Sequence, residues 1–202
     1  MTAESPSVQS LRDAFGSAIL RAVVVCGDTI VYMARDRAHD VLAWLKDTPD
    51  QAFNYLTDIT AVEYRDPERP FEVVYQLRSL ERCADLRLKI ELDPQGDLRV
   101  DSVYDLWRGA DWLEREVFDM FGVTFTGHPD LRRILMWETY SEGHPLRKDF
   151  PLRGHFSRAE QVRRALSLKP EEHYSPEELE LGRKRLGGDK AGRVPSSGGG
   201  GA

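Results

Sequence analysis

The chain has 202 residues, of which 41% are hydrophobic and 31% charged, with a formal net charge of -6. This length accommodates one ordinary domain with its own core and an appendage. The weakly acidic charge argues against a protein that binds nucleic acid through bulk charge. No segment resembles a signal peptide, and no apolar run approaches the roughly 18 residues of a membrane span. We therefore expect a protein made and kept in the cytoplasm, which reaches a membrane only through partners.

Cys26 and Cys83 are the only cysteines. Two thiolates cannot hold an iron–sulfur cluster or a closed cysteine-rich zinc site. Each lies in an apolar, strand-like context, so we expect two reduced core residues, with a disulfide between them as the alternative.

The first half of the chain predicts two helices and a hairpin. Residues 1–16 are expected to be an N-terminal segment with a short helix that Gly16 ends. The runs 19–25 and 29–33 predict a hairpin with its turn near residues 26–28. Apolar spacing over 36–46 predicts a helix, with Asp36 as its N-cap.

Three segments then alternate apolar and polar residues with a period of two, which indicates strands with one buried face. The residues expected on the buried faces are Phe53, Tyr55, Thr57, Ile59 and Ala61, then Phe71, Val73, Tyr75 and Leu77, then Leu86, Leu88, Ile90 and Leu92. Residues 98–104 suggest a further short strand. The fold class is therefore α+β, an antiparallel or mixed sheet with helices on one face. We expect this domain over 17–126, an extended partner-binding arm with short helices over 127–186, and a disordered tail over 187–202.

The stretch 106–152 carries the densest mixture of charged, aromatic and turn-forming residues. Residues 106–121 predict a helix with one apolar stripe, and Gly122 is a suitable C-cap. Glu114 and Glu116 fall on opposite borders of the stripe, where a carboxylate is half-buried and needs a cation. Arg115 and Asp119 are spaced for an ion pair on the same face. Glutamates two residues apart point in different directions, so a shared acid–base site is not expected.

Two Gly-His-Pro turns follow the helix. His128 and His144 lack further ligands at metal spacing, so we expect each imidazole to hydrogen-bond backbone in its turn. After the second turn, prolines keep the chain extended, and Leu146, Phe150 and Leu152 cannot bury themselves there without another surface. An extended apolar string of this kind is typical of a segment that wraps a partner. Capping-box patterns predict short helices at about 157–167 and 175–186.

The run from Glu114-Arg115-Glu116 through Asp119-Met120-Phe121-Gly122 to residues 127–135 resembles the signature of the 30-kDa subunit family of respiratory complex I, the bacterial NADH-quinone oxidoreductase. The string 143–152 is similarly characteristic, whereas 136–141 departs from the family pattern. The resemblance implies a member of the peripheral arm that carries no catalytic, cofactor or metal site of its own. FMN, the iron–sulfur clusters and quinone would then belong to other subunits.

By the same resemblance, the chain would bind the 49-kDa-type subunit and other peripheral-arm subunits, at the cytoplasmic face of the bacterial inner membrane. The residues that carry over as signature and interface positions are Glu114, Arg115, Glu116, Asp119, Phe121, Gly122, His128, Pro129, Leu131, Arg132, Arg133, His144, Pro145, Arg147, Lys148, Asp149 and Pro151.

Three alternatives remain open from the sequence. The chain could be the equivalent subunit of a related membrane-bound hydrogenase, which neighbouring genes would decide. A free-standing module for single-stranded nucleic acid would need Tyr55, Phe71 and Tyr75 exposed for base stacking. An independent enzyme would need a nucleophile–base pair or a metal constellation, and the sequence shows neither.

Overall fold

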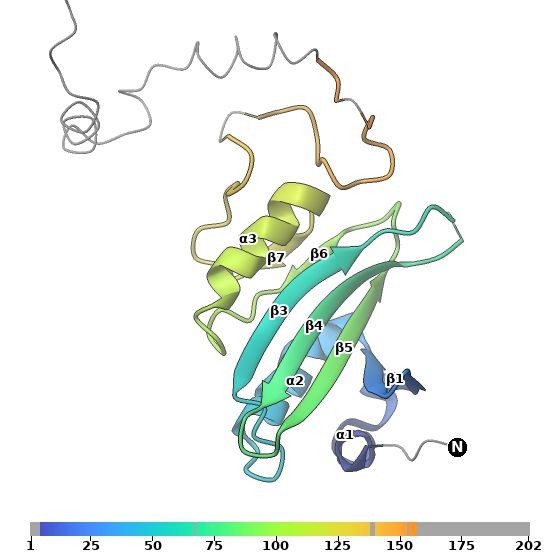
Figure 1. Ribbon diagram of the computed structural model, residues 1–202, viewed down its shortest axis with the longest axis vertical. Coiled ribbons are helices and arrows are strands. Elements are labelled where there is room, and N and C mark those ends of the chain that lie inside the picture. The colour runs from blue at the N-terminus through green and yellow to red at the C-terminus, as the bar shows by residue number, and fades with distance from the viewer. Residues whose placement is uncertain (1–4, 67, 138–139, 153, 157–202) are drawn as a thin grey trace, which may run out of the picture. The chain divides into compact units, whose positions relative to one another are not determined.

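A computed structural model describes residues 5–66, 68–137, 140–152 and 154–156. The chain divides into two compact units, Met1–His155 and Phe156–Ala202, and the first carries every helix and strand described. Its elements are α1 (Pro6–Phe15), β1 (Ile19–Val25), β2 (Asp28–Met33), α2 (Ala38–Asp47), β3 (Tyr55–Val62), β4 (Phe71–Ser79), β5 (Ala84–Leu92), β6 (Arg99–Asp101), α3 (Ala110–Phe121) and β7 (Thr124–Thr126) (Figure 1). The helices expected at 157–167 and 175–186 and the tail 187–202 lie outside the described residues.

Five strands form one sheet in the order β1-β2-β5-β4-β3. Neighbours pair antiparallel except β2 and β5, which are parallel. The sheet is therefore mixed, and the predicted α+β class is confirmed. The short strand expected near residues 98–104 is β6, which pairs in parallel with β7 as a separate two-stranded sheet.

The hydrophobic core lies on one face of the five-stranded sheet. Val8 and Leu11 of α1 and Val41, Leu42 and Leu45 of α2 are fully buried in it. The period-two pattern of β5 explains this, since Leu86, Leu88, Ile90 and Leu92 all point into the core. No helix covers the opposite face of β3, β4 and β5 in the described part of the chain (Figure 1).

The burial pattern of β3 differs from the sequence expectation. Its pairing with β4 shifts between Leu56 and Asp58, as at a β-bulge. An extra residue moves the following side chains to the other face. Beyond the shift Ile59 and Ala61 are buried as expected, whereas before it Leu56 is buried in place of Tyr55, and Thr57 at the shift is also exposed.

The cysteines are also not where the sequence placed them. Cys26 and Cys83 are free and exposed, so the expectation of two core residues is wrong. Both occupy the β1–β2 and β4–β5 turns with positive φ, 52° and 49°. Cys26 lies in the turn that the sequence predicted for residues 26–28, and a residue in such a turn is not buried with the strands beside it. The expected N-cap at Asp36 is wrong too, because a 3-10 turn over Arg35–Arg37 precedes α2.

A search of the described residues for a helix long and apolar enough to span the bilayer finds none.

Candidate docking site

Helix α3 organises the stretch that the sequence singled out. It begins at Ala110, not at the expected residue 106, because residues 104–109 form turns. Ala110 and Val117 of its apolar stripe are buried in the core. Gly122 ends the helix in the left-handed conformation, with φ 83°, and its N–H donates to the carbonyl of Phe118. The predicted C-cap is confirmed.

Of the two glutamates of α3, Glu114 is the buried one, with 0% of the residue exposed. The sequence placed it on the stripe's border, half-buried and beside a cation. Instead the Ser102 hydroxyl donates to one carboxylate oxygen at 2.7 Å, and the Val103 N–H donates to the other at 2.7 Å. Burial, aided by the charges of Asp105 and Asp111 and opposed by these hydrogen bonds, raises the pKa of Glu114 to about 7.

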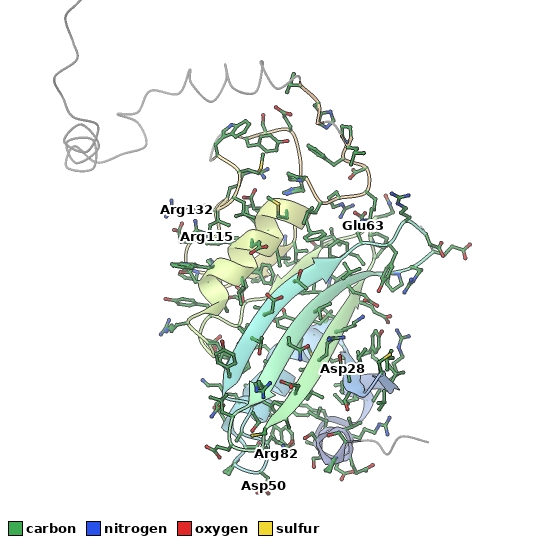
Figure 2. The ribbon with its side chains drawn as sticks, viewed as in Figure 1. Asp28, Asp50, Glu63, Arg82, Arg115 and Arg132 are labelled. Atoms are coloured by element: carbon green, nitrogen blue, oxygen red, sulfur yellow. The ribbon has the colours of Figure 1, made fainter. Side chains whose placement is uncertain are left out.

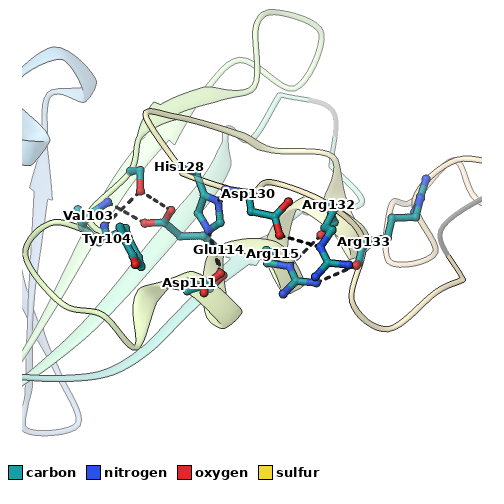
Figure 3. A network of polar contacts seen from close by, with 10 residues as sticks. Val103, Tyr104, Asp111, Glu114, Arg115, His128, Asp130, Arg132 and Arg133 are labelled. Carbon is teal, nitrogen blue, oxygen red and sulfur yellow. Dashed lines mark hydrogen bonds and ion pairs between the residues drawn. The ribbon is translucent and has the colours of Figure 1, made fainter. Parts of the chain in front are cut away.

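The first Gly-His-Pro turn is fastened to the first turn of α3. The His128 side chain is buried, with Nε2 3.2 Å from the carbonyl oxygen of Asp111. Its Nδ1 accepts the N–H of Asp130 at 3.0 Å, so Nε2 is the nitrogen that carries the proton and donates. Figure 3 shows the imidazole beside Glu114. The expected backbone-bonding role of His128 is confirmed.

Asp119 binds the segment that follows α3 through both oxygens of its carboxylate. One oxygen accepts the N–H groups of Ile134, Leu135 and Met136 at 3.1, 2.8 and 2.8 Å, and the other accepts Arg133 at 2.6 Å. Burial alone would raise the pKa of Asp119, but these donors hold it below its ordinary value. A single buried carboxylate thus fixes the path of the chain over residues 133–136.

Arg115 does not form the ion pair with Asp119 that the spacing suggested. Its guanidinium donates to the carbonyl oxygens of Arg132 and Arg133, both at 3.2 Å. Arg132 in turn pairs with Asp130 at 2.8 Å. Arg115 and Arg132 lie close together on the outer side of α3 (Figures 2 and 3). The signature cations therefore fasten the arm to its own helix.

The second Gly-His-Pro turn is fastened to the end of α3. His144 Nδ1 lies 3.0 Å from the carbonyl oxygen of Asp119, and the Leu146 N–H donates to the carbonyl of Met120 at 3.0 Å. The His144 ring lies against Gly122, where an added Cβ would come within 2.7 Å of it. Gly122 is therefore required twice, by its positive φ and by this close approach.

The cationic string after this turn reaches the end of β3. Arg147 lies 3.4 Å from a carboxylate oxygen of Glu63, and the backbone N–H of Lys148 donates to the other oxygen at 2.6 Å. Figure 2 shows Glu63 at the arm end of the sheet. Arg147 also lies 3.9 Å from the exposed Asp149. Sequence reasoning missed Glu63 and Ser102, because strand alternation gives no sign of contacts with segments so distant in the chain.

The remaining signature residues either pack against the core or lie at the surface. Phe121 makes an edge-to-face contact with Phe71 at 5.9 Å, and Leu131 packs against the core. Pro145 and Pro151 line a groove of about 760 Å³ with Leu146, Arg147, Lys148, Phe150, Leu152 and Arg65. Pro129 belongs to the first turn and has no contact that decides a role.

Several large side chains near α3 remain in solvent. Trp112 is 69% exposed, Leu135 61%, and Leu152 fully exposed. Glu116 is exposed, so its expected place on the stripe's border is wrong; it lies one helical turn after Trp112. Trp112 and Glu116 are thus exposed on α3, and Leu135 and Leu152 are exposed in the segment that follows it.

Phe71 and Tyr75 are buried, at 0% and 1%, so they cannot stack on bases. In the part of the chain described, no three His, Cys, Asp or Glu side chains gather as metal ligands would.

The fold and site define a class: an α+β domain whose helix α3 holds the segment that follows it in place. The chain belongs to the family of the respiratory-chain NADH dehydrogenase 30 Kd subunit, whose model matches residues 31–156. It is 43% identical over 155 residues to the C subunit of NADH-quinone oxidoreductase from Geobacter sulfurreducens, covering 76% of this chain and 93% of that protein. The corresponding protein of Roseiflexus sp. is 46% identical over 145 residues, covering 72% and 82%.

Two solved structures are similar. A trypsin-resistant fragment of Nqo5 aligns with a TM-score of 0.53 and 32% identity, over 62% of this chain and 98% of the fragment. A chain of an archaeal membrane-bound sulfane sulfur reductase, a respiratory membrane complex, aligns with a TM-score of 0.54 over 84% of this chain and 93% of that chain. At 23% identity, the second likeness concerns the fold alone.

Proposed function

We propose that this chain is a non-catalytic member of the peripheral arm of a proton-translocating NADH-quinone oxidoreductase. It docks the 49-kDa-type subunit through residues 127–156 and the outer face of α3. Electron transfer from NADH to quinone belongs to the assembly, whose FMN and iron–sulfur clusters lie in other subunits. The chain sits at the cytoplasmic face of the bacterial cell membrane and reaches the membrane only through the complex.

The observation that carries this proposal is the contrast between two sets of residues in one segment. Polar signature residues such as Asp119 and Arg133 pair within the chain, whereas Glu116 is exposed. The apolar residues between them, such as Leu135 and Leu152, are left in solvent. An ordered segment with its apolar side chains exposed is typical of a preformed protein interface.

The same contrast assigns two kinds of role to the signature residues. Arg147 and Asp119 are positioning residues, because they fix the arm without facing a partner. Glu116 is a contact residue, and so is Trp112, which is not a signature residue, because both side chains face solvent from α3.

Leu152→Asp tests the docking surface. Placing a charge in a desolvated interface costs several kcal/mol, so we expect recovery of the chain with a tagged 49-kDa-type subunit to fall at least about tenfold. Leu80→Asp is the matched control, because Leu80 is a 58% exposed leucine in the β4–β5 turn. Equal recovery of both variants would refute the docking assignment.

Glu116→Ala tests the carboxylate on α3, and the double variant Arg147→Ala, Lys148→Ala removes the Arg147–Glu63 ion pair and the Lys148 side chain while the Lys148 N–H bond to Glu63 is kept. We expect both to weaken assembly more than they lower the thermal stability of the domain. Circular dichroism provides the stability measurement. Normal assembly of both variants would count against an interface role for these residues.

A further inference from the structure

Strand β1 is an edge of the five-stranded sheet. It pairs with β2 from Ile19↔Met33 to Val25↔Asp28, with a shift between Ile19 and Arg21. In the described part of the chain, no other segment pairs with its second side. Alternate residues of β1 therefore direct their N–H and C=O groups outward, as a strand edge does when it can accept another strand.

The side chains of β1 do not protect this edge. Natural edges are usually blunted by lysine, proline or a covering segment. The run 22–26 contains Ala, Val, Val, Val and Cys. Leu20 is 56% exposed, Val23 38% and Val25 51%.

Arg21 is the only charged residue of β1, and it lies across the sheet. Its guanidinium carbon is 3.7 Å from the centroid of the Tyr32 ring on β2. The same group pairs with Glu91 of β5. Arg21 thus lies over neighbouring strands, and its charge is not placed at the free edge, where it would oppose pairing with another strand.

The opposite edge of the sheet, formed by β3, has different surroundings. There β3 packs extensively against α3, whereas β1 has a smaller contact with α1. The asymmetry singles out β1 as the edge left open, with β-branched residues that favour strand pairing.

We propose that β1 accepts, by strand addition, an extended segment of a neighbouring subunit other than the one held by the arm. The segment presents apolar side chains toward Val23 and Val25, and its backbone satisfies the outward groups of β1. Figure 1 places β1 at the end of the domain away from the arm, so one neighbour would not easily contact both. The domain thereby bridges two neighbours in the assembly.

A second copy of this chain fits the edge less well. The edge offers three exposed apolar side chains, Leu20, Val23 and Val25, whereas a stable interface uses roughly 20–30 residues on each side. Self-pairing on so small a surface is weak. Within an assembly the arm already holds the chain, and the resulting effective concentration, on the order of millimolar, makes a short strand sufficient. The inference rests on membership of a multi-subunit complex, and not on which subunit the arm binds.

Amide hydrogen exchange tests this proposal on the purified full chain and on the intact complex. We expect the outward amides of residues 19–25 to exchange rapidly in the free chain and at least about tenfold more slowly in the complex. In the double variant Val23→Lys, Val25→Lys, this protection should be lost while the chain is still recovered with the complex. The control Leu80→Lys adds one exposed charge in the β4–β5 turn and should leave β1 protected.

Each possible result either supports the strand-addition proposal or overturns it. Rapid exchange of β1 in the intact wild-type complex would overturn the proposal, whatever the variants do. Concentration-dependent protection of β1 in the free chain would overturn it in favour of self-pairing. Failure of the arm assignment would appear separately, as unchanged recovery of Leu152→Asp with the 49-kDa-type subunit.

Discussion

The buried carboxyl of Glu114 makes the stability of this domain depend on pH in an unusual direction. Its folded-state pKa is about 7, against an ordinary value of 4.5. The folded chain therefore holds a proton that the unfolded chain has released between these two values. Protonated Glu114 contributes stability that is complete below pH 4.5 and is lost as the pH rises through 7. A shift of this size corresponds to about 3 kcal/mol.

Glu114→Gln removes this dependence. The amide is neutral at every pH, its oxygen can accept the Val103 N–H, and its nitrogen can donate to the Ser102 hydroxyl oxygen. We expect the variant to equal the wild type at pH 4.5 and to exceed it by about 3 kcal/mol at pH 8.5.

Urea unfolding of both proteins between pH 4.5 and pH 8.5 measures the difference between their free energies of unfolding. The other titrating groups contribute equally to both proteins and cancel in this difference. A variant that is less stable than the wild type by a constant amount across the range would refute the reasoning. That result would mean that the carboxyl is ionised in the fold and that its two hydrogen bonds outweigh its burial.

Two further changes test the attachment of the arm. Gly122→Ala forces a side chain into a positive φ and against the His144 ring, which should cost about 1–3 kcal/mol in urea unfolding; an unchanged midpoint would contradict the close approach. Asp119→Asn weakens the contact with Arg133 and leaves that buried cation without its counter-ion, so we expect a loss of about 3 kcal/mol and faster proteolysis within 133–136. Protease resistance equal to that of the wild type would show that Asp119 does not fix the arm.

Hydrophobic periodicity predicted the buried face of those elements whose side chains follow one regular spacing. The alternation of β5 and the apolar stripe of α3 each gave the buried face correctly, because every residue obeys one geometric rule along the element. The same rule failed at β3, where the shift between Leu56 and Asp58 reverses the faces. The turn at residues 26–28 was predicted correctly, but the apolar run before it made Cys26 look like a core residue, whereas it is an exposed turn residue.

The candidate site was predictable in its residues and not in its contacts. The sequence indicated that Glu114 and Glu116 need cations and that Asp119 pairs with Arg115, whereas the cation on Asp119 is Arg133. It could not indicate that Glu114 would bind Ser102 and a backbone N–H instead. Those partners are twelve and eleven residues distant in the chain, and the fold brings them together where the residues that follow β6 meet the helix.

The contacts at Asp119 and His144 have a consequence for how freely this chain can change its sequence. They act as two fixed points, one before and one after the stretch 137–143. The chain enters that stretch from a set position and leaves it at another, both measured from the same helix. Substitutions between the fixed points therefore need not shift the residues downstream. The stretch 137–143 can therefore vary in sequence while the course of the arm beyond His144 stays unaltered.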